Sequence, residues 1–403
     1  MSGGLQDLRR VALETWRTAG LPSRRDEAWK YTDVARLGVA ELPLAETAEA
    51  PTSVPAAFGD SPQVVLCNGF LATLPAVLPE GLTICRLETA DPVPAELGRL
   101  LPEGAKSFAA MNGALFTDGL VLRLAAGVRL EQPVELVSLG QAGQGPLAFH
   151  PRLLVVLEAG ASMVLVERHH GSGRYFSNGV SEIALGEGAQ LAHYLLQDAP
   201  AEAVHLSLTA LTLQGRAGYQ AVSVQLGAEL SRLELLPLMA GEGASFSIDG
   251  AYVGHDRQHL DNTTFVVHRA PHCSSRQVFK GVLDDHARGV FQGSVLVERG
   301  AQKTDAHQLS KALLLSDTAE MDAKPELEIY ADDVKCGHGA TIGDIDEMAL
   351  FYLRARGIGE AEARQMLIDA FLAEVVDCIL PEAVRLGFAD ALTRHLAKSK
   401  EVR

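Results

Sequence analysis

The chain has 403 residues, of which 47% are hydrophobic, and a formal net charge of −16 at pH 7. This composition excludes a disordered chain, and a chain of this length buries a large core without disulfide bonds or structural metals. The acidic excess argues against nucleic acid and anionic membranes as partners. Five scattered cysteines without a CxxC pair, and a start without the apolar core of a signal peptide, predict a cytoplasmic protein.

Residues 1–62 are predicted to form an N-terminal helical region and a linker. Apolar residues recur at helical spacing over 5–16, and Gly20 can end that helix in a left-handed conformation. A second short helix is expected over 26–37, whereas 40–62 has the composition of a linker. We interpret Trp29, in the second helix, as an anchor that docks this region on the rest of the molecule.

Residues 63–343 are predicted to form a β core. Short apolar runs such as VVLCNG and RLLVVLEAG are separated by Gly, Pro and Asp, and no pattern of helix length interrupts them. Gly-Ala pairs, in which glycine permits a tight corner and alanine packs beneath it, recur along residues 160–340. Their glycines are Gly160, Gly188, Gly227, Gly243, Gly300 and Gly339. Such repetition favours stacked coils, as in a β-helix or β-solenoid, over a large sandwich or a Rossmann-type fold.

Residues 344–403 are predicted to form a C-terminal helical domain. Asp344 and Glu347 have the spacing of a capping box at the start of a helix. An apolar stripe over 363–378 predicts a longer helix, and Pro381 begins a final one. The predicted fold class is therefore mainly β, with helical regions before and after the β core.

The motifs of a self-sufficient enzyme are absent from the sequence. It contains no GxxxxGK[ST] loop for ATP, no GxSxG nucleophile elbow and no HExxH zinc motif. The glycine-rich segment 171–179 lacks the third glycine of a dinucleotide fingerprint. We interpret Cys67, Cys85 and Cys378 as core residues, because each lies in an apolar strand or on an apolar helix stripe.

The pair Cys336 and His338 carries the clearest chemical signal. Two residues apart on a strand, their side chains lie on the same face, and both are suited to bind iron or zinc. Gly337 and Gly339 lie on the opposite face, where another backbone can approach closely. Two ligands do not complete a site, so a metal would need others from elsewhere in the chain or from a partner. A buried strand face shows the same alternation, and that structural interpretation stays open.

Three segments resemble one known family. They are DEAWKYTD at Asp26–Asp33, DNTTFVVHRAPHC at Asp261–Cys273 and the long stretch Phe279–Ile358, and together they reach both ends of the chain. They are similar to the SufB/SufD family of the Suf machinery for iron–sulfur cluster assembly. DDVKCGHGAT at Asp332–Thr341 is similar to the SufD branch, as is the lack of any cysteine between Cys273 and Cys336.

The resemblance implies a right-handed parallel β-helix with helical regions at both ends, in a scaffold subunit that has no catalytic activity of its own. It implies that the β-helix pairs with SufB and that the C-terminal helical domain binds the ATPase SufC. His338, with Cys336 as its neighbour, would lie at the SufB–SufD interface as a candidate ligand or helper for the nascent cluster. The segment expected to meet SufC contains Met348, Phe351, Tyr352 and Leu353. Iron and the cluster would bind transiently in the complex, and we expect no cofactor bound tightly to the isolated chain.

Two other functions stay open at this point. A β-helix enzyme acting on polysaccharides needs charged residues along one face of the solenoid, and the acidic stretch 302–347 could supply some of them. A homodimeric interaction module without metal is the second alternative. The edge expected to pair with SufB could equally pair two copies of the isolated chain.

Overall fold

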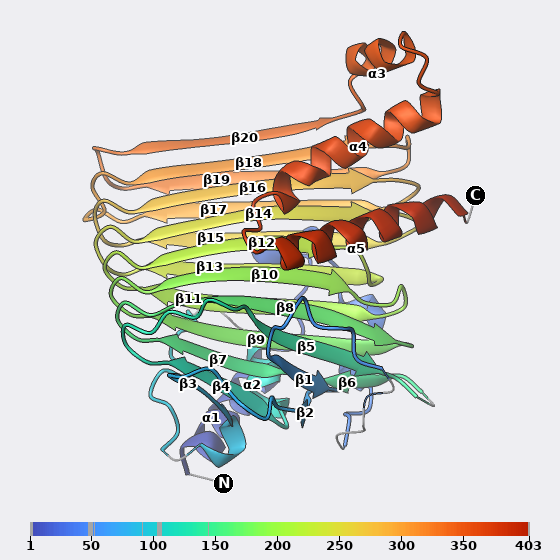
Figure 1. Cartoon of the computed structure of the whole chain (residues 1–403). Coiled ribbons are helices and arrows are strands. Elements are labelled where there is room, and N and C mark those ends of the chain that lie inside the picture. The colour runs from blue at the N-terminus through green and yellow to red at the C-terminus, as the bar shows by residue number, and fades with distance from the viewer. Residues whose placement is uncertain are drawn as a thin grey trace.

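In the computed structural model, which describes residues 3–46, 51, 53–90, 92–102, 107–143 and 145–401, strands account for 44% of the chain and helices for 20%. The strands wind into a β-solenoid of about eight turns, and helices lie before and after it (Figure 1). The predicted fold class, a mainly β protein with a β-helix core and helical regions at both ends, is therefore confirmed.

The solenoid consists of two sheets, sheet A and sheet B. Sheet B has the strand order β2-β1-β5-β8-β10-β12-β14-β16-β18-β20, and sheet A has the order β19-β17-β15-β13-β11-β9-β7-β4-β3, with β6 beside β9. The strands are β1 (Gln63–Cys67), β2 (Phe70–Thr73), β3 (Leu82–Arg86), β4 (Gly119–Leu124), β5 (Val134–Gln141), β6 (Leu147–Phe149), β7 (Arg152–Leu157), β8 (Ser162–Ser172), β9 (Tyr175–Leu185), β10 (Gln190–Asp198), β11 (Val204–Leu213), β12 (Gly218–Gln225), β13 (Leu230–Met239), β14 (Ser245–Gly254), β15 (His259–His268), β16 (Ser274–Leu283), β17 (Arg288–Val297), β18 (Asp305–Leu314), β19 (Glu320–Ile329) and β20 (Lys335–Gly343).

From β8 onward the chain alternates strictly between the sheets, so each coil adds one strand to sheet B and one to sheet A. Neighbouring coils pair in parallel, whereas the first strands form the antiparallel pairs β1–β2 and β3–β4. Side chains alternate along each strand between the lumen of the solenoid and its outer surface. The lumen holds one continuous apolar core that extends from Val64 to Ala331.

One corner of the solenoid repeats from coil to coil in a left-handed backbone conformation. Its residues are Gly127, Gly160, Gly188, Arg216, Gly243, His272 and Lys303, and each donates its backbone N–H to a carbonyl of the next coil at 2.6–3.1 Å. Three of the predicted Gly-Ala pairs lie at this corner, at Gly160, Gly188 and Gly243. The pair at Gly339 lies inside β20, so that part of the prediction is wrong. The feature that repeats at this corner is the left-handed backbone conformation, and Arg216, His272 and Lys303 adopt it as well as the glycines.

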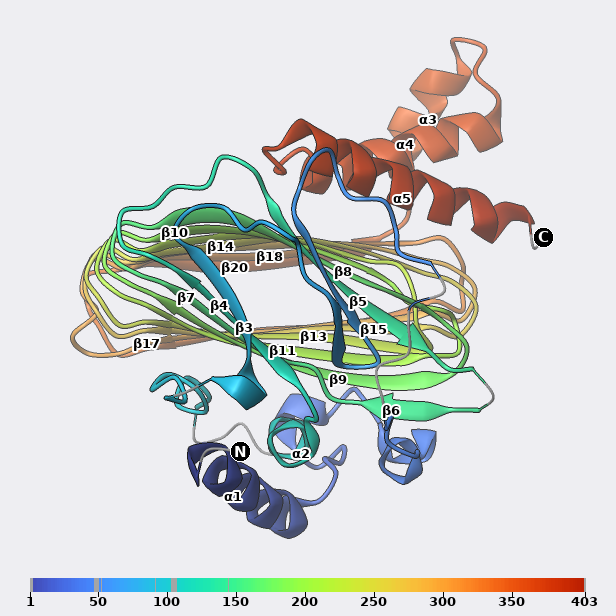
Figure 2. The same ribbon diagram turned by 60° about the horizontal axis from the view of Figure 1, so that its bottom comes forward.

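Most of the helices cover the outer faces of the two sheets (Figure 2). N-terminal elements pack on sheet A, where Trp29 and Phe108 contact Phe176 and Leu206. C-terminal helices pack on sheet B through residues such as Leu372. The helices are α1 (Gly3–Ala19), α2 (Phe108–Leu115), α3 (Glu347–Arg354), α4 (Glu360–Val376) and α5 (Glu382–Glu401), with 3-10 turns η1 (Glu27–Trp29), η2 (Ala35–Leu37), η3 (Val39–Glu41) and η4 (Leu87–Thr89). No helix in these described residues is long and apolar enough to span a bilayer.

Several local predictions are wrong. The helix expected over 26–37 is replaced by η1 and η2, because Trp29 and Leu37 both turn toward sheet A and hold the segment against it. Helix α2 lies in the region that was expected to lack helices. Because α2 is buried on nearly all sides, its sequence shows no apolar stripe from which a helix could be predicted. Cys85 is exposed on β3, at the edge of sheet A.

The capping prediction for the first C-terminal helix is displaced by two residues. The N-cap of α3 is Asp346, whose carboxylate accepts hydrogen bonds from the backbone N–H groups of Met348 and Ala349. Asp344 instead accepts from the N–H of Ile345 at 2.6 Å. A carboxylate caps a helix only from the residue at which the chain enters it, and β20 continues to Gly343.

Candidate functional site

The two sheets end at strands β19 and β20, each of which has a strand partner on one side only among the described residues (Figure 1). Such an edge presents unpaired N–H and C=O groups to which another chain can add a strand. Strand β20 consists mainly of small residues, KCGHGATIG, and carries little of the charge that usually protects an edge. We call this end of the solenoid the open end.

Cys336 and His338 lie on β20 at the open end, and both face the lumen. Their register partners on β18 are Ala306 and Gln308, which are buried inside the solenoid. The side chain of His338 is exposed, whereas Cys336 is half-buried against the lumen core. The structure thus places the thiol and the imidazole on one face of one strand, as their spacing predicts.

The thiol of Cys336 is held in its protonated form. Burial raises its pKa, Asp305 adds to this effect, and the backbone N–H of Ala306 opposes it. Because the thiolate is the metal-binding form, a metal ion binding here would have to displace the proton. Among the residues that the structure describes, no group of three or more His, Cys, Asp or Glu side chains is arranged to hold a metal ion.

Gly337 and Gly339 face outward on the opposite side of β20. They contribute to a shallow hollow of about 770 Å³ on the outer surface of sheet B, together with Arg276 and His307. A β-carbon built at Gly339 would lie 3.3 Å from Leu309, and one at Gly337 would lie 3.5 Å from the Nδ1 atom of His307. The glycines therefore keep the backbone of the terminal strand accessible on this side.

Helix α3 extends beyond the open end and exposes an apolar surface. Met348, Phe351 and Tyr352 are 74%, 68% and 57% exposed, and the guanidinium of Arg356 lies 3.3 Å from the centre of the Tyr352 ring. Leu353 is half-buried and Leu350 is buried. Of the four residues predicted to contact a partner, three therefore lie on the solvent-exposed side of this short helix: Met348, Phe351 and Tyr352.

Two polar residues beneath His338 were not recognised in the sequence. Gln277 on β16, Gln308 on β18 and His338 on β20 are successive register partners and form one column of lumen-facing side chains. Neighbouring members of this column are separated in the sequence by the length of one coil. Knowledge of that length would have allowed the column to be predicted from the sequence. Gln277 and Gln308 are both buried, so this column places polar side chains inside the lumen directly beneath His338.

A second polar cluster in the lumen also escaped the sequence analysis. Glu167 lies 3.1 Å from the Nε2 atom of His193 and 3.5 Å from that of His169, and the ring of His205 lies beside His169. Burial would raise the pKa of Glu167, but His193 and His169 together hold it below its ordinary value. The only signal of this cluster in the sequence is the spacing of Glu167 and His169, two residues apart on one strand. The histidines of the cluster stabilise the buried carboxylate of Glu167.

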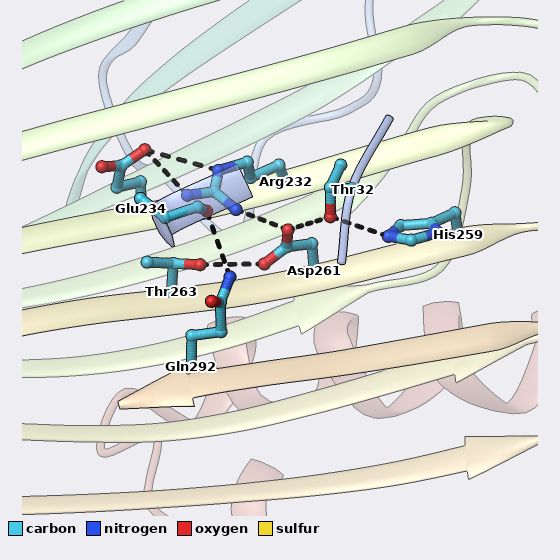
Figure 3. A network of polar contacts seen from close by, with 8 residues as sticks. Thr32, Arg232, Glu234, His259, Asp261, Thr263 and Gln292 are labelled. Atoms are coloured by element: carbon cyan, nitrogen blue, oxygen red, sulfur yellow. Dashed lines mark hydrogen bonds and ion pairs between the residues drawn. The ribbon is translucent and has the colours of Figure 1, made fainter. Parts of the chain in front are cut away.

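The segment that contains Trp29 is held on sheet A by a buried polar network (Figure 3). The hydroxyl of Thr32 donates to Asp261 and lies 2.9 Å from the Nε2 atom of His259. Asp261 also pairs with Arg232 at 2.5 Å, and the Arg232 guanidinium lies 4.1 Å from the centre of the Trp29 ring. Trp29 is thus a docking anchor, as predicted, and this network is structural.

Comparison with known proteins gives consistent matches over most of the chain. A family model described as the SUF system FeS cluster assembly, SufBD core domain, matches residues 139–371. The chain is 32% identical over 397 residues to an iron–sulfur cluster assembly SufBD family protein of Synechocystis, covering 93% of this chain and 87% of that protein. It is 30% identical to the iron–sulfur cluster assembly protein SufD of Escherichia coli, covering 91% and 87%. A SufBD family protein of Mycobacterium bovis is 28% identical, covering 93% and 89%.

Proposed function

This chain belongs to the SufBD family of iron–sulfur cluster assembly proteins, and we propose that it is the SufD-type scaffold subunit of a SufB–SufC–SufD complex. One observation carries the proposal. The solenoid ends in an uncovered strand, β20, that holds a thiol and an imidazole on its lumen face. Another subunit that covers this end would complete a site of this kind.

SufB is the proposed partner at the open end. Unpaired backbone groups on β19 and β20 can continue both sheets into a second solenoid, and apolar residues such as Ile329 and Ile342 would be covered at the same time. Iron and sulfide are then the substrates assembled at this junction, and Cys336 and His338 act as ligands or helpers while the nascent cluster is held.

SufC is the proposed partner of helix α3. Met348, Phe351 and Tyr352 form an apolar patch on a helix that projects away from the solenoid. ATP binding would draw two SufC subunits together, and each would pull on the C-terminal helices of SufB or of this chain. The resulting strain would open the junction and admit iron and sulfide. The scaffold itself performs no catalysis, and the complex works in the cytoplasm.

The polysaccharide enzyme is the less favoured alternative, because acidic residues that could line a catalytic groove are engaged in ion pairs. Asp322 pairs with Arg288, Asp333 with Lys303, and Glu326 with Lys324. The open end, by contrast, presents unpaired backbone groups of β19 and β20 to which another subunit can bind.

Substitution of His338 tests the proposal. In a reconstituted SufB–SufC–SufD complex, His338→Ala should lower the yield of cluster from ferrous iron and sulfide by about tenfold. His307→Ala is the matched control, since His307 is an exposed histidine on the outer face of the neighbouring strand. Assembly of the three subunits is checked by size-exclusion chromatography. Full cluster formation by an intact His338→Ala complex would exclude a role for this imidazole.

A further inference from the structure

The column Gln277–Gln308–His338 leaves a specific set of hydrogen-bonding atoms unpaired. The hydroxyl of Thr264 donates to the Oε1 atom of Gln277 at 2.5 Å, which leaves the Nε2 atom of Gln277 without a partner. Both amide atoms of Gln308 are also buried without a partner. Gln308 is only 3% exposed, so water outside the solenoid does not hydrate it freely. A buried donor or acceptor of this kind destabilises the protein unless it finds a partner.

The three orphan atoms are two donors and one acceptor. Register partners on adjacent strands lie about 4.8 Å apart, so the Nε2 atom of Gln277 can donate to the Oε1 atom of Gln308 in the coil above it. One donor then remains, the Nε2 atom of Gln308. The next side chain in the column is His338, whose ring offers a nitrogen lone pair.

The amide of Gln308 lies inside the lumen and reaches toward the facing strand β17. A β-carbon built at Gly293, on the facing strand β17, would lie 2.9 Å from its Nε2 atom. The amide therefore occupies space that only a glycine leaves open across the lumen. Toward the open end, the side chain that follows Gln308 in the column is that of His338.

We propose that Gln308 is a positioning residue that fixes the tautomer of His338, so that the outward ring nitrogen carries the proton. A neutral imidazole has one N–H and one lone pair, and donation from Gln308 assigns the lone pair to the inner nitrogen. The outer N–H then donates to an anionic sulfur, as sulfide or thiolate, at the subunit junction. This inference rests on the proposed function and assigns His338 to the sulfur of the nascent cluster rather than to its iron.

Two substitutions of Gln308 test the column. Gln308→Met keeps the length of the side chain and removes both hydrogen-bonding atoms, and Gln308→Glu replaces the donor by an acceptor. Both should lower cluster formation in the reconstituted complex by about tenfold, with an unchanged melting temperature as the check on folding. Gln225→Met is the matched control, because Gln225 is a buried lumen glutamine on β12 outside this column. Full activity of a folded Gln308→Met complex would overturn the proposal.

Rescue at position 338 separates a hydrogen-bond donor from an iron ligand. His338→Asn and His338→Gln place an amide N–H near one or the other ring nitrogen, and at least one of them should restore most of the activity that His338→Ala loses. If both are as inactive as His338→Ala, the donor role is wrong while the site at the open end stands. If His338→Ala itself is fully active, the proposed function fails and this inference fails with it.

Discussion

At the scale of the residue, many polar side chains of this protein are buried, and Asp261 and Arg232 are among them. Asp261 accepts hydrogen bonds from Thr32 and Thr263 and pairs with Arg232, and both members of the ion pair are almost completely buried. Burial alone would lower the pKa of Arg232, but Asp261 and Glu234 raise it above its ordinary value. These groups connect the N-terminal segment to sheet A.

Asp261→Asn should lower the free energy of unfolding by about 3 kcal/mol, because it leaves the charge of Arg232 poorly compensated inside the protein. The measurement is chemical denaturation monitored by Trp fluorescence, since Trp29 lies beside Arg232. Asp390→Asn is the control, because its pair with Arg394 is 62% exposed on both sides and should change stability by less than about 0.5 kcal/mol. Equal effects of the two substitutions would contradict the structural role of Asp261.

Buried histidines predict how stability depends on pH. Burial lowers the pKa of His150, His259 and His268 to about 4 each, so they remain neutral in the folded chain where unfolded histidines become protonated. The unfolded state therefore binds more protons between about pH 6.5 and pH 4, and stability falls as the pH falls through this range. A shift of this size corresponds to about 3 kcal/mol for each histidine.

His268→Gln should make the decrease in melting temperature between pH 7 and pH 5 shallower, because one protonation of the unfolded state is removed. His307→Gln is the control, as His307 is exposed. The two variants and the parent chain are compared by calorimetry over this pH range. A profile for His268→Gln parallel to that of the parent chain would contradict the assignment.

At the scale of the element, helix α3 is the least integrated helix of the C-terminal domain. Its contacts are mainly with α4, and only Leu350 among its residues is buried. In α4 and α5, by contrast, Leu372 and Phe388 are fully buried in the cluster on the outer face of sheet B. A short helix with three exposed large apolar residues is a surface available to another protein.

If the proposed function holds, Phe351→Asp should weaken binding of SufC by at least about tenfold and leave the melting temperature unchanged, because the ring is exposed and a charge would be buried in the interface. Leu386→Asp on α5 is the matched control, since Leu386 is similarly exposed at 58%. Affinity is measured by titration calorimetry with purified SufC. Equal loss of binding in both variants would place the contact outside α3.

At the scale of the whole molecule, the two ends of the solenoid differ. The first coil ends in the antiparallel pairs β1–β2 and β3–β4, whereas the last coil ends in β19 and β20 without a further strand among the described residues. Pro325 has no backbone N–H, so the row of hydrogen-bond donors along β19 is broken at this residue. Strand β20 contains no proline and keeps all of its backbone N–H groups. Association at this end is therefore expected mainly through β20.

On the proposed pairing with SufB, Ala340→Lys should weaken that association by about tenfold or more, because a charge on the lumen face of the terminal strand opposes extension of the core. The same substitution should prevent self-association of the isolated chain through this edge. Both are measured by analytical ultracentrifugation, with Lys335→Ala at the exposed start of β20 as the control. Unaltered association of the Ala340→Lys chain would place the interface elsewhere.

Local periodicity in the sequence determined the β core, the helical ends and the shared face of Cys336 and His338. These features depend on alternation along one strand or on helical spacing, which neighbouring residues specify by themselves. The same reasoning failed for α2, which has no polar face, and for the 3-10 turns near Trp29, which form because sheet A holds that segment.

Only the tertiary structure decided what lies beneath His338. Gln277, Gln308 and His338 are each separated by one coil, and the length of a coil depends on corner loops whose size varies along the chain. Hydrogen bonds between strands set this register, and they join residues about 30 positions apart. Which polar side chains share a column is therefore a property of the assembled solenoid, and no local pattern specifies it.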